Sequence, residues 1–154
     1  LTDLEKTIKA AKEKYQLDGI VSGALFSTYQ RDRIERICDK LGLKIFAPLW
    51  HKSQEELLRE LVSNGFEVIL TKIAADGMDK SWLGRKVDDN LINDMIKINQ
   101  KVGINVAFEG GEAESLVLYC PLFRKRIKLV KTKIEMDSKY SGQLIIEEAR
   151  IVEN

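Results

Sequence analysis

The sequence predicts an α/β fold that changes character near its middle. In the first half, helix-start signals alternate with short apolar runs, at the spacing of parallel strands joined by right-handed helical crossovers. In the second half, one amphipathic stretch is surrounded by further apolar runs, which predicts an α+β part. We therefore expect an α/β domain over residues 1–75 and a smaller α+β domain over residues 76–154.

Three capping boxes mark the helices of the first half. In each, a Ser or Thr is followed three residues later by Glu or Gln, so that two unpaired amides at a helix start are satisfied. The boxes begin at Thr2, Ser27 and Ser53, and the helices are expected to end near Tyr15, at Gly42 and at Asn64. The apolar runs predict parallel strands over residues 19–22, 44–47 and 67–74.

The second half contains one further helix signal. Asp88 or Asp89 can cap a helix near residues 89–101, in which apolar positions recur at helical spacing. The preceding residues 76–85 are typical of a loop. The remaining apolar runs predict strands over residues 104–108, 115–119, 126–130 and 143–151.

Composition excludes several classes of protein. With 44% hydrophobic and 32% charged residues in 154, the chain is of an ordinary globular type. A net charge of +1 gives no argument for nucleic-acid or membrane binding, and no apolar run approaches membrane-spanning length. Cys38 and Cys120 are too few for a disulfide framework or a zinc cluster and fit a reducing cytosol. With His51 as the only histidine, a histidine-based metal cluster is not expected, and no residue is assigned as a metal ligand.

The first chemical cluster is an acidic turn at residues 109–114. It holds three carboxylates (Glu109, Glu112, Glu114) and the adjacent glycines Gly110 and Gly111. Apolar runs on both sides predict a strand, a turn and a strand. Negative charge packed into a turn costs stability unless a cation, a proton or a substrate offsets it. The alternative is a solvated acidic turn without a ligand.

The second cluster lies where the first predicted strand meets its helix. Ser22, Gly23 and Ala24 follow the strand, and ligands of open parallel sheets bind beyond the carboxyl ends of strands. Arg31 and Arg33 are slightly unfavourable near the positive end of a helix dipole, but they suit a bound phosphate. The alternative is that both arginines extend along a solvated helix face.

Three blocks of residues carry a resemblance to a known family. They are residues 22–35, Pro48 to Trp50, and residues 109–115 followed by Pro121 to Phe123. In order and spacing they resemble the diphthine–ammonia ligase family of N-type ATP pyrophosphatases. The resemblance implies a partial Rossmann-like (HUP-type) parallel sheet that binds an adenine nucleotide, followed by a smaller substrate domain. It also implies that ATP activates the carboxylate of diphthine on elongation factor 2 as an acyl-adenylate, which ammonia converts to diphthamide.

This resemblance fixes the expected ligands and partners. ATP with Mg²⁺, ammonium and elongation factor 2 are expected for the parent protein, in the cytoplasm, with no membrane and no direct nucleic-acid partner; a homodimer stays open. Two alternatives also remain: a binding module without catalysis, and another ATP pyrophosphatase acting on tRNA.

Site residues follow from the two clusters and the resemblance. We expect Glu112 and Glu114 to handle ammonium or the trimethylammonium of diphthine, and Glu109 to support the turn or a metal. The expected nucleotide contacts are Ser22, Gly23, Ala24, Gln30, Arg31 and Arg33. The expected substrate contacts are Tyr29, Trp50, Trp82, Gly110 and Gly111. We expect the acidic turn to face the same cleft as Gly23 and Arg31.

The chain departs from the family pattern in two ways. The pyrophosphate-binding motif Ser-Gly-Gly-Lys-Asp-Ser does not occur in this sequence. The family places it upstream of the segment beginning at Leu1, so we expect a fragment of the ligase that binds ATP weakly or not at all. In the acidic turn, Phe108 replaces a common glycine, Ala113 an aromatic residue and Ser115 a threonine. A compensating exchange of bulk between Phe108 and Ala113 is one interpretation, and altered specificity is the other.

Overall fold

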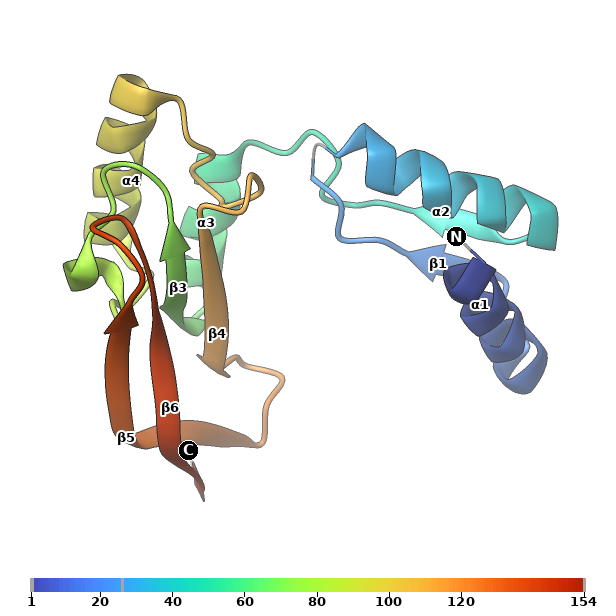
Figure 1. The fold of residues 1–154 in the computed structure, drawn as a ribbon. Coiled ribbons are helices and arrows are strands. Elements are labelled where there is room, and N and C mark those ends of the chain that lie inside the picture. Colours follow the sequence, from blue (N-terminus) through green and yellow to red (C-terminus); the bar gives the residue numbers. More distant parts are fainter. Residues whose placement is uncertain (1, 26, 154) are drawn as a thin grey trace. The chain divides into compact units, whose positions relative to one another are not determined.

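The computed structural model describes residues 2–25 and 27–153, which form two compact units, Leu1–Lys52 and Ser53–Asn154 (Figure 1). Unit 1 contains α1 (Thr2–Tyr15), β1 (Gly19–Val21), α2 (Thr28–Leu41) and β2 (Lys44–Phe46). Unit 2 contains α3 (Gln54–Ser63), β3 (Glu67–Ala74), the short 3₁₀ helix η1 (Lys80–Trp82), α4 (Asp89–Val102), β4 (Ala113–Tyr119), β5 (Lys125–Met136) and β6 (Ser141–Glu153).

Unit 1 is a small parallel α/β layer. β1 pairs in parallel with β2, as predicted, and both helices contribute to a single core that includes Ile8, Ile37 and Cys38. On the opposite face of the sheet, Val21 and Phe46 lie side by side in register and are 73% and 64% exposed. Parallel sheets are normally covered on both faces, so this apolar face is unusual for a parallel sheet.

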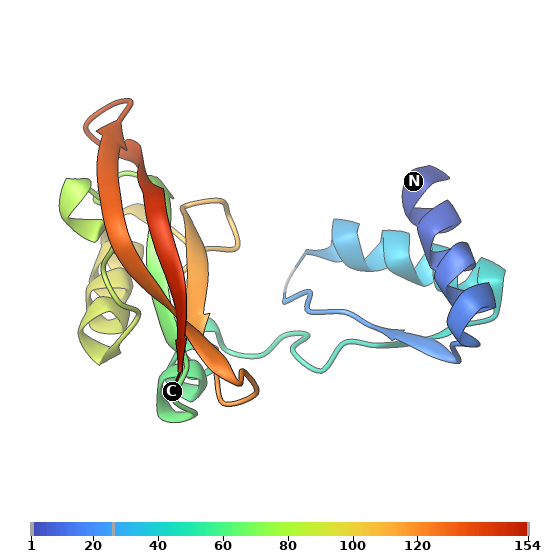
Figure 2. The ribbon, with the colours of Figure 1, turned by 90° about the horizontal axis from the view of Figure 1, so that it is seen from below.

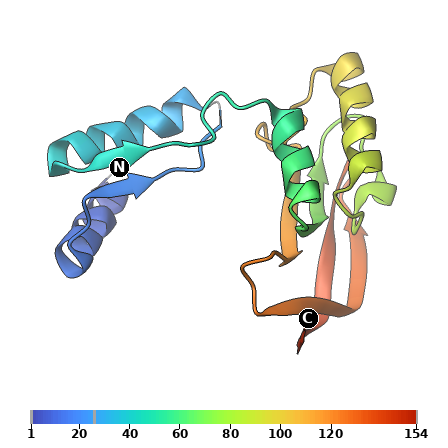
Figure 3. The same cartoon turned by 180° about the vertical axis from the view of Figure 1, so that it is seen from behind.

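Unit 2 is an antiparallel sheet with helices on one face. The strand order is β4-β3-β6-β5, and α3 and α4 lie side by side against the sheet (Figures 2 and 3). The shared core includes Leu58 of α3, Leu70 and Ile73 of β3, and Leu91 and Met95 of α4. The predicted order of an α/β part followed by an α+β part is therefore confirmed, but in this chain the α+β unit is the larger of the two.

The prediction that the strand at residues 67–74 joins the parallel sheet is wrong. β3 pairs antiparallel with β4 and β6 in unit 2. A buried apolar run has the same appearance in either type of sheet, and the partners of β3 lie some 40 to 70 residues further along the chain. The division between the units accordingly falls at residues 52/53, upstream of the domain boundary expected near residue 75.

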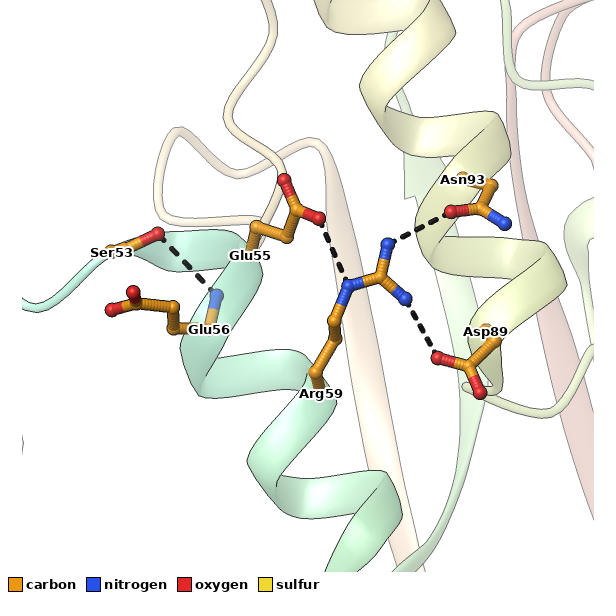
Figure 4. Close-up of polar contacts among 6 residues, drawn as sticks. All are labelled: Ser53, Glu55, Glu56, Arg59, Asp89 and Asn93. Carbon is orange, nitrogen blue, oxygen red and sulfur yellow. Dashed lines mark hydrogen bonds and ion pairs between the residues drawn. The ribbon is translucent and has the colours of Figure 1, made fainter.

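An arginine clamp joins α3 to α4 (Figure 4). Arg59 donates from Nε to Glu55 at 2.9 Å, from Nη1 to Asp89 at 2.7 Å and from Nη2 to Asn93 at 2.9 Å. The start of α3 is closed by Ser53, whose hydroxyl accepts from the Glu56 amide at 3.4 Å, as the third capping box predicts. The amino-terminal end of α3, where Gln54 lies, is thus held in place in unit 2.

The helix predicted near residues 89–101 is present as α4. The Asp88 carboxylate caps it by accepting from the Leu91 amide at 2.8 Å, and Gly103 ends it with φ +76°. Across the part of the chain that the structure describes, no helix combines the length and apolar character needed to cross a membrane.

Candidate functional site

The acidic loop, residues 103–112, is not a strand. The strand predicted over residues 104–108 is wrong: the chain forms successive turns in which the Phe108 amide donates to Asn105 O at 3.2 Å and the Gly111 amide to Phe108 O at 3.1 Å. Phe108 has φ +65°, in the left-handed region, which a strand residue does not occupy. Only the outgoing strand of the predicted strand–turn–strand forms, as β4.

Glu112 closes this loop from inside. It is 7% exposed, and its carboxylate accepts three hydrogen bonds from the loop itself. The Asn105 amide and Asn105 Nδ2 donate to Oε1 at 2.7 and 2.9 Å, and the Gly110 amide donates to Oε2 at 2.8 Å. The backbone of Glu112 is tied to β3, because the Ala74 amide donates to Glu112 O at 2.8 Å.

Burial and hydrogen bonding act on Glu112 in opposite directions. Burial raises the pKa of its carboxyl, but the hydrogen bonds from Asn105 and Gly110 outweigh burial, so the pKa lies below its ordinary value. Glu112 is therefore an ionised carboxylate at neutral pH, and a weak base.

Gln54 extends this network to α3. Its Oε1 accepts from the Ala107 amide at 3.0 Å, and its Nε2 donates to Asn105 Oδ1 at 3.1 Å. Sequence reasoning missed both Gln54 and Asn105. The available signal was the polar Asn105 in an otherwise apolar run, which an alternating strand does not require at that position.

The two glycines of the turn are required for different structural reasons. A Cβ on Gly110 would lie 2.4 Å from Glu112 Oε1 and 2.6 Å from Asn105 Nδ2, so this position has no room for a side chain. Gly111 has φ +85° and open space around its missing side chain. Gly110 thus makes room for the buried carboxylate, and Gly111 permits the turn.

The other two carboxylates face solvent. Glu109 lies at the exposed tip of the acidic loop, with no ion pair to any described residue. Glu114, on β4, pairs with Lys72 of β3 at 3.1 Å and is also exposed. Within residues 2–25 and 27–153, no group of three or more Asp, Glu, His or Cys side chains could hold a metal ion.

In unit 1 the predicted nucleotide-binding residues follow the carboxyl end of β1. Ser22 is buried; its amide donates to Phe46 O at 2.9 Å, and its hydroxyl accepts from the Ala24 amide at 3.3 Å. Gly23 is exposed, and the space that a side chain would fill is open. This segment presents backbone near the start of α2, where an anion is favoured.

The arginines of α2 lie against aromatic rings of unit 1. The guanidinium of Arg31 is 4.8 Å from the centroid of Trp50, and its Nε donates to Glu35 at 2.7 Å. Arg33 lies 4.0 Å from the centroid of Tyr29. The structure thus pairs each expected nucleotide-binding arginine with an expected substrate-binding aromatic residue. The side chain of Gln30 lies outside the described residues.

The remaining residues singled out from the sequence lie in a core or stack on a neighbouring side chain. Trp82 is 6% exposed in the core of unit 2, and Arg85 stacks on its ring at 4.7 Å. Cys38 is a core residue, as expected, and burial raises the pKa of its thiol. His51 is exposed and stacks on Trp50 at 4.8 Å. That the acidic turn and Gly23 share a cleft stays a prediction.

Comparison with known proteins gives consistent matches along the chain. Residues 2–45 match the diphthamide synthase N-terminal domain, and residues 53–152 match the diphthamide synthase C-terminal domain. The chain is 39% identical to the human diphthine–ammonia ligase over 136 residues, 88% of this chain and 51% of that protein. It is 41% identical to the Schizosaccharomyces pombe diphthine–ammonia ligase over 133 residues, 86% of this chain and 22% of that protein. The Saccharomyces cerevisiae protein of the same name is 30% identical over 141 residues, 80% of this chain and 20% of that protein. The chain thus spans about half the length of the human relative, and less of the fungal ones.

Proposed function

The chain belongs to the diphthamide synthase family, and we propose that it is part of an ATP-dependent ligase that converts diphthine on elongation factor 2 to diphthamide. One observation carries this proposal. The two family domains match in sequence order, and the change from one to the other, between residues 45 and 53, falls where the chain divides into its two units. The match therefore follows the architecture and is not confined to one motif.

The proposed reaction has two steps, an adenylyl transfer and an acyl transfer, and the atoms balance in each. The diphthine carboxylate attacks the α-phosphorus of ATP, pyrophosphate leaves, and an acyl-adenylate forms. Ammonia then attacks the acyl carbon, AMP leaves, and the nitrogen gives up a proton. A carboxylate is a poor electrophile at neutral pH, so this activation is what the second step requires.

Unit 1 is proposed to contribute to the nucleotide site. Backbone around Gly23 at the end of β1 and the start of α2 supports contact with an anionic group, and Arg31 and Arg33 add positive charge. The uncovered apolar face at Val21 and Phe46 supports a further layer of structure packed on this sheet in the parent protein. Mg²⁺ would enter with the phosphates of ATP, since it is usually bound by one or two carboxylates together with substrate phosphates.

Unit 2 is proposed to contribute the acidic groups that face the cationic nitrogen. Glu109 and Glu114 are the carboxylates that reach solvent, and carboxylates attract both ammonium and the quaternary ammonium of diphthine. Amidation of a translation factor in turn supports a cytoplasmic location for the parent protein.

The test is a reconstitution of the parent ligase. Purified parent protein is incubated with ATP, Mg²⁺, ammonium and elongation factor 2 that carries diphthine. We expect diphthamide by mass spectrometry, with AMP and pyrophosphate each formed in a one-to-one ratio to it. Glu109→Gln should reduce amide formation, while Glu56→Gln, the same change on an exposed face of α3, should not. No amide product from the wild type, or cleavage of ATP to ADP and phosphate, would overturn the proposal.

A further inference from the structure

Five hydrogen bonds hold the acidic loop in shape and connect it to α3. In order they run from the Ala107 amide to Gln54, from Gln54 to Asn105, twice from Asn105 to Glu112, and from the Gly110 amide to Glu112. We call these five bonds the amide relay.

We propose that Gln54, Asn105 and Glu112 are positioning residues of the ligase, which hold the turn at residues 108–111 in the shape that amidation requires, and that Glu112 takes no proton from the substrate. The inference rests on the proposed function and changes the role expected for Glu112. It assigns the ligase two residues, Gln54 and Asn105, that the sequence motifs do not include.

The relay has a fixed direction. Gln54 uses its oxygen for Ala107 and its nitrogen for Asn105, so it cannot flip without facing donor to donor and acceptor to acceptor. Asn105 then has its oxygen toward Gln54 and its nitrogen toward Glu112. The series ends on a group that only accepts, which an ionised carboxylate is. The type of each polar group is therefore set by the group before it.

The environment of Glu112 is unsuited to proton exchange with a substrate. Three of about four acceptor positions on its two oxygens are filled by donors from its own loop. The side chain is 7% exposed, and the missing side chain of Gly110 makes room for it and for no further group. A base that must meet ammonium needs an open oxygen within hydrogen-bond reach.

The turn that the relay holds carries the exposed carboxylate. Glu109 lies between Phe108, with φ +65°, and Gly110, whose amide is bonded to Glu112. The backbone on both sides of Glu109 is thus fixed. Because the Arg59 clamp ties α3 to α4, the Gln54 end of the relay is also fixed. A displacement of about 1 Å at a reacting group can reduce a rate by 100-fold, so the shape of this turn matters for rate.

The test exchanges the amide and the carboxylate at the two ends of the relay. Gln54→Glu places an oxygen against Asn105 Oδ1, and Glu112→Gln places an NH₂ group against the Gly110 amide. In the double variant Gln54→Glu/Glu112→Gln, Asn105 can flip and the relay runs in reverse. It then keeps four of the five hydrogen bonds and loses the one from the Asn105 amide.

Two readouts are compared for the wild type, both single variants and the double variant. The first is hydrogen exchange of the Ala107 and Gly110 amides in the 154-residue chain. The second is the pH profile of kcat/KM for ammonium in the parent ligase. Glu56→Gln and Gln100→Glu make the same chemical changes at exposed helix positions and serve as matched controls.

A positioning role predicts coupled behaviour. Each single variant should speed exchange of these amides about tenfold or more and lower kcat/KM by about 10- to 100-fold, without changing the shape of the pH profile. The double variant should recover a large part of both losses. If it recovers slow exchange but stays as inactive as Glu112→Gln, or if Glu112→Gln flattens the pH profile, Glu112 is a proton acceptor and the inference is wrong.

Failure of the proposed function is distinguishable from failure of this inference. A wild-type parent protein that forms no diphthamide overturns the function alone. Unchanged exchange at Ala107 and Gly110 in both single variants overturns the relay, whatever the parent protein catalyses.

Discussion

Gly110→Ala should be the most damaging single methyl group that can be added to the acidic loop. Its Cβ would lie 2.4 Å from Glu112 Oε1 and 2.6 Å from Asn105 Nδ2, closer than a Cβ atom approaches other heavy atoms in proteins. Because the backbone here is bonded to Glu112 and to β3, the carboxylate itself must move. Displacing it breaks buried hydrogen bonds to a charged group, each with a net value of about 1.5–3 kcal/mol, part of which water restores. We expect a loss of about 3 kcal/mol in the unfolding free energy of unit 2.

The assay uses the two tryptophans, one in each unit. Trp82 is buried in the core of unit 2 and Trp50 lies in unit 1, so Trp82 fluorescence in a Trp50→Phe background reports unit 2. A loss of about 3 kcal/mol corresponds to a fall in Tm of roughly 12–24 °C for a domain of about 100 residues.

Two glycine variants separate the cause of this loss. Gly111→Ala adds strain at φ +85° without a clash and should cost about 1–2 kcal/mol. Gly65→Ala, which is also in unit 2, adds a side chain at φ +75° where the space is open, and it should cost a similar amount, about 1–2 kcal/mol. If Gly110→Ala is no more destabilising than Gly111→Ala, the relay contributes little and the reasoning is refuted.

Three further predictions follow from the same geometry. Phe108→Gly should be more stable than Phe108→Ala by about 1 kcal/mol in urea denaturation, because both lose the ring but only glycine adopts φ +65° without strain. Equal stability of the two variants would mean that the backbone at position 108 is not strained. The depressed pKa of Glu112 contributes stability that is present above its ordinary pKa of 4.5 and is lost as pH falls through the lower folded-state pKa. The stability difference between wild type and Glu112→Gln should therefore be constant near neutral pH and shrink as the pH falls below 4.5, and a difference that grows on acidification contradicts this. Finally, the 154-residue chain should bind ATP weakly or not at all in calorimetry, since the Ser-Gly-Gly-Lys-Asp-Ser motif is not in its sequence; micromolar affinity would contradict that expectation.

The local signals in the sequence predict the helices well, and the pairing of distant strands poorly. A capping box is a contact between residues three positions apart, so Ser53 and Glu56 can be recognised from the sequence and are found as expected. The pairing of β3 with β6 joins Lys72 to Gln143, and no pattern within β3 specifies such a partner. Parallel order was inferred from alternation alone, which holds for β1 and β2 but not for the strand that follows them.

The site shows the same limit at the scale of single side chains. Alternation along a strand would place Glu112 and Glu114 on one side if the strand included both. The strand begins at Ala113, so Glu112 belongs to the loop and points into it, while Glu114 faces solvent and pairs with Lys72. The sequence predicts that a cation, a proton or a substrate offsets the charge of the turn. For Glu112 the structure shows hydrogen-bond donors from Asn105 and Gly110 instead, and Asn105 is in turn bonded to Gln54, about 50 residues earlier.

The departures from the family pattern are best understood through the packing of the loop. Phe108 stands where the resembling family commonly has glycine, and its φ of +65° is a conformation in which glycine carries no strain. A side chain is retained there at a cost of about 1–2 kcal/mol, so it must be offset by contacts. Phe108 packs against the core of unit 2, and Ala113, which replaces an aromatic residue, is buried in that same core. A core conserves its volume more strictly than the identity of its residues. The side-chain volume lost at position 113 and the volume gained at position 108 therefore change the same core. This favours compensation over altered specificity as the reason for both departures.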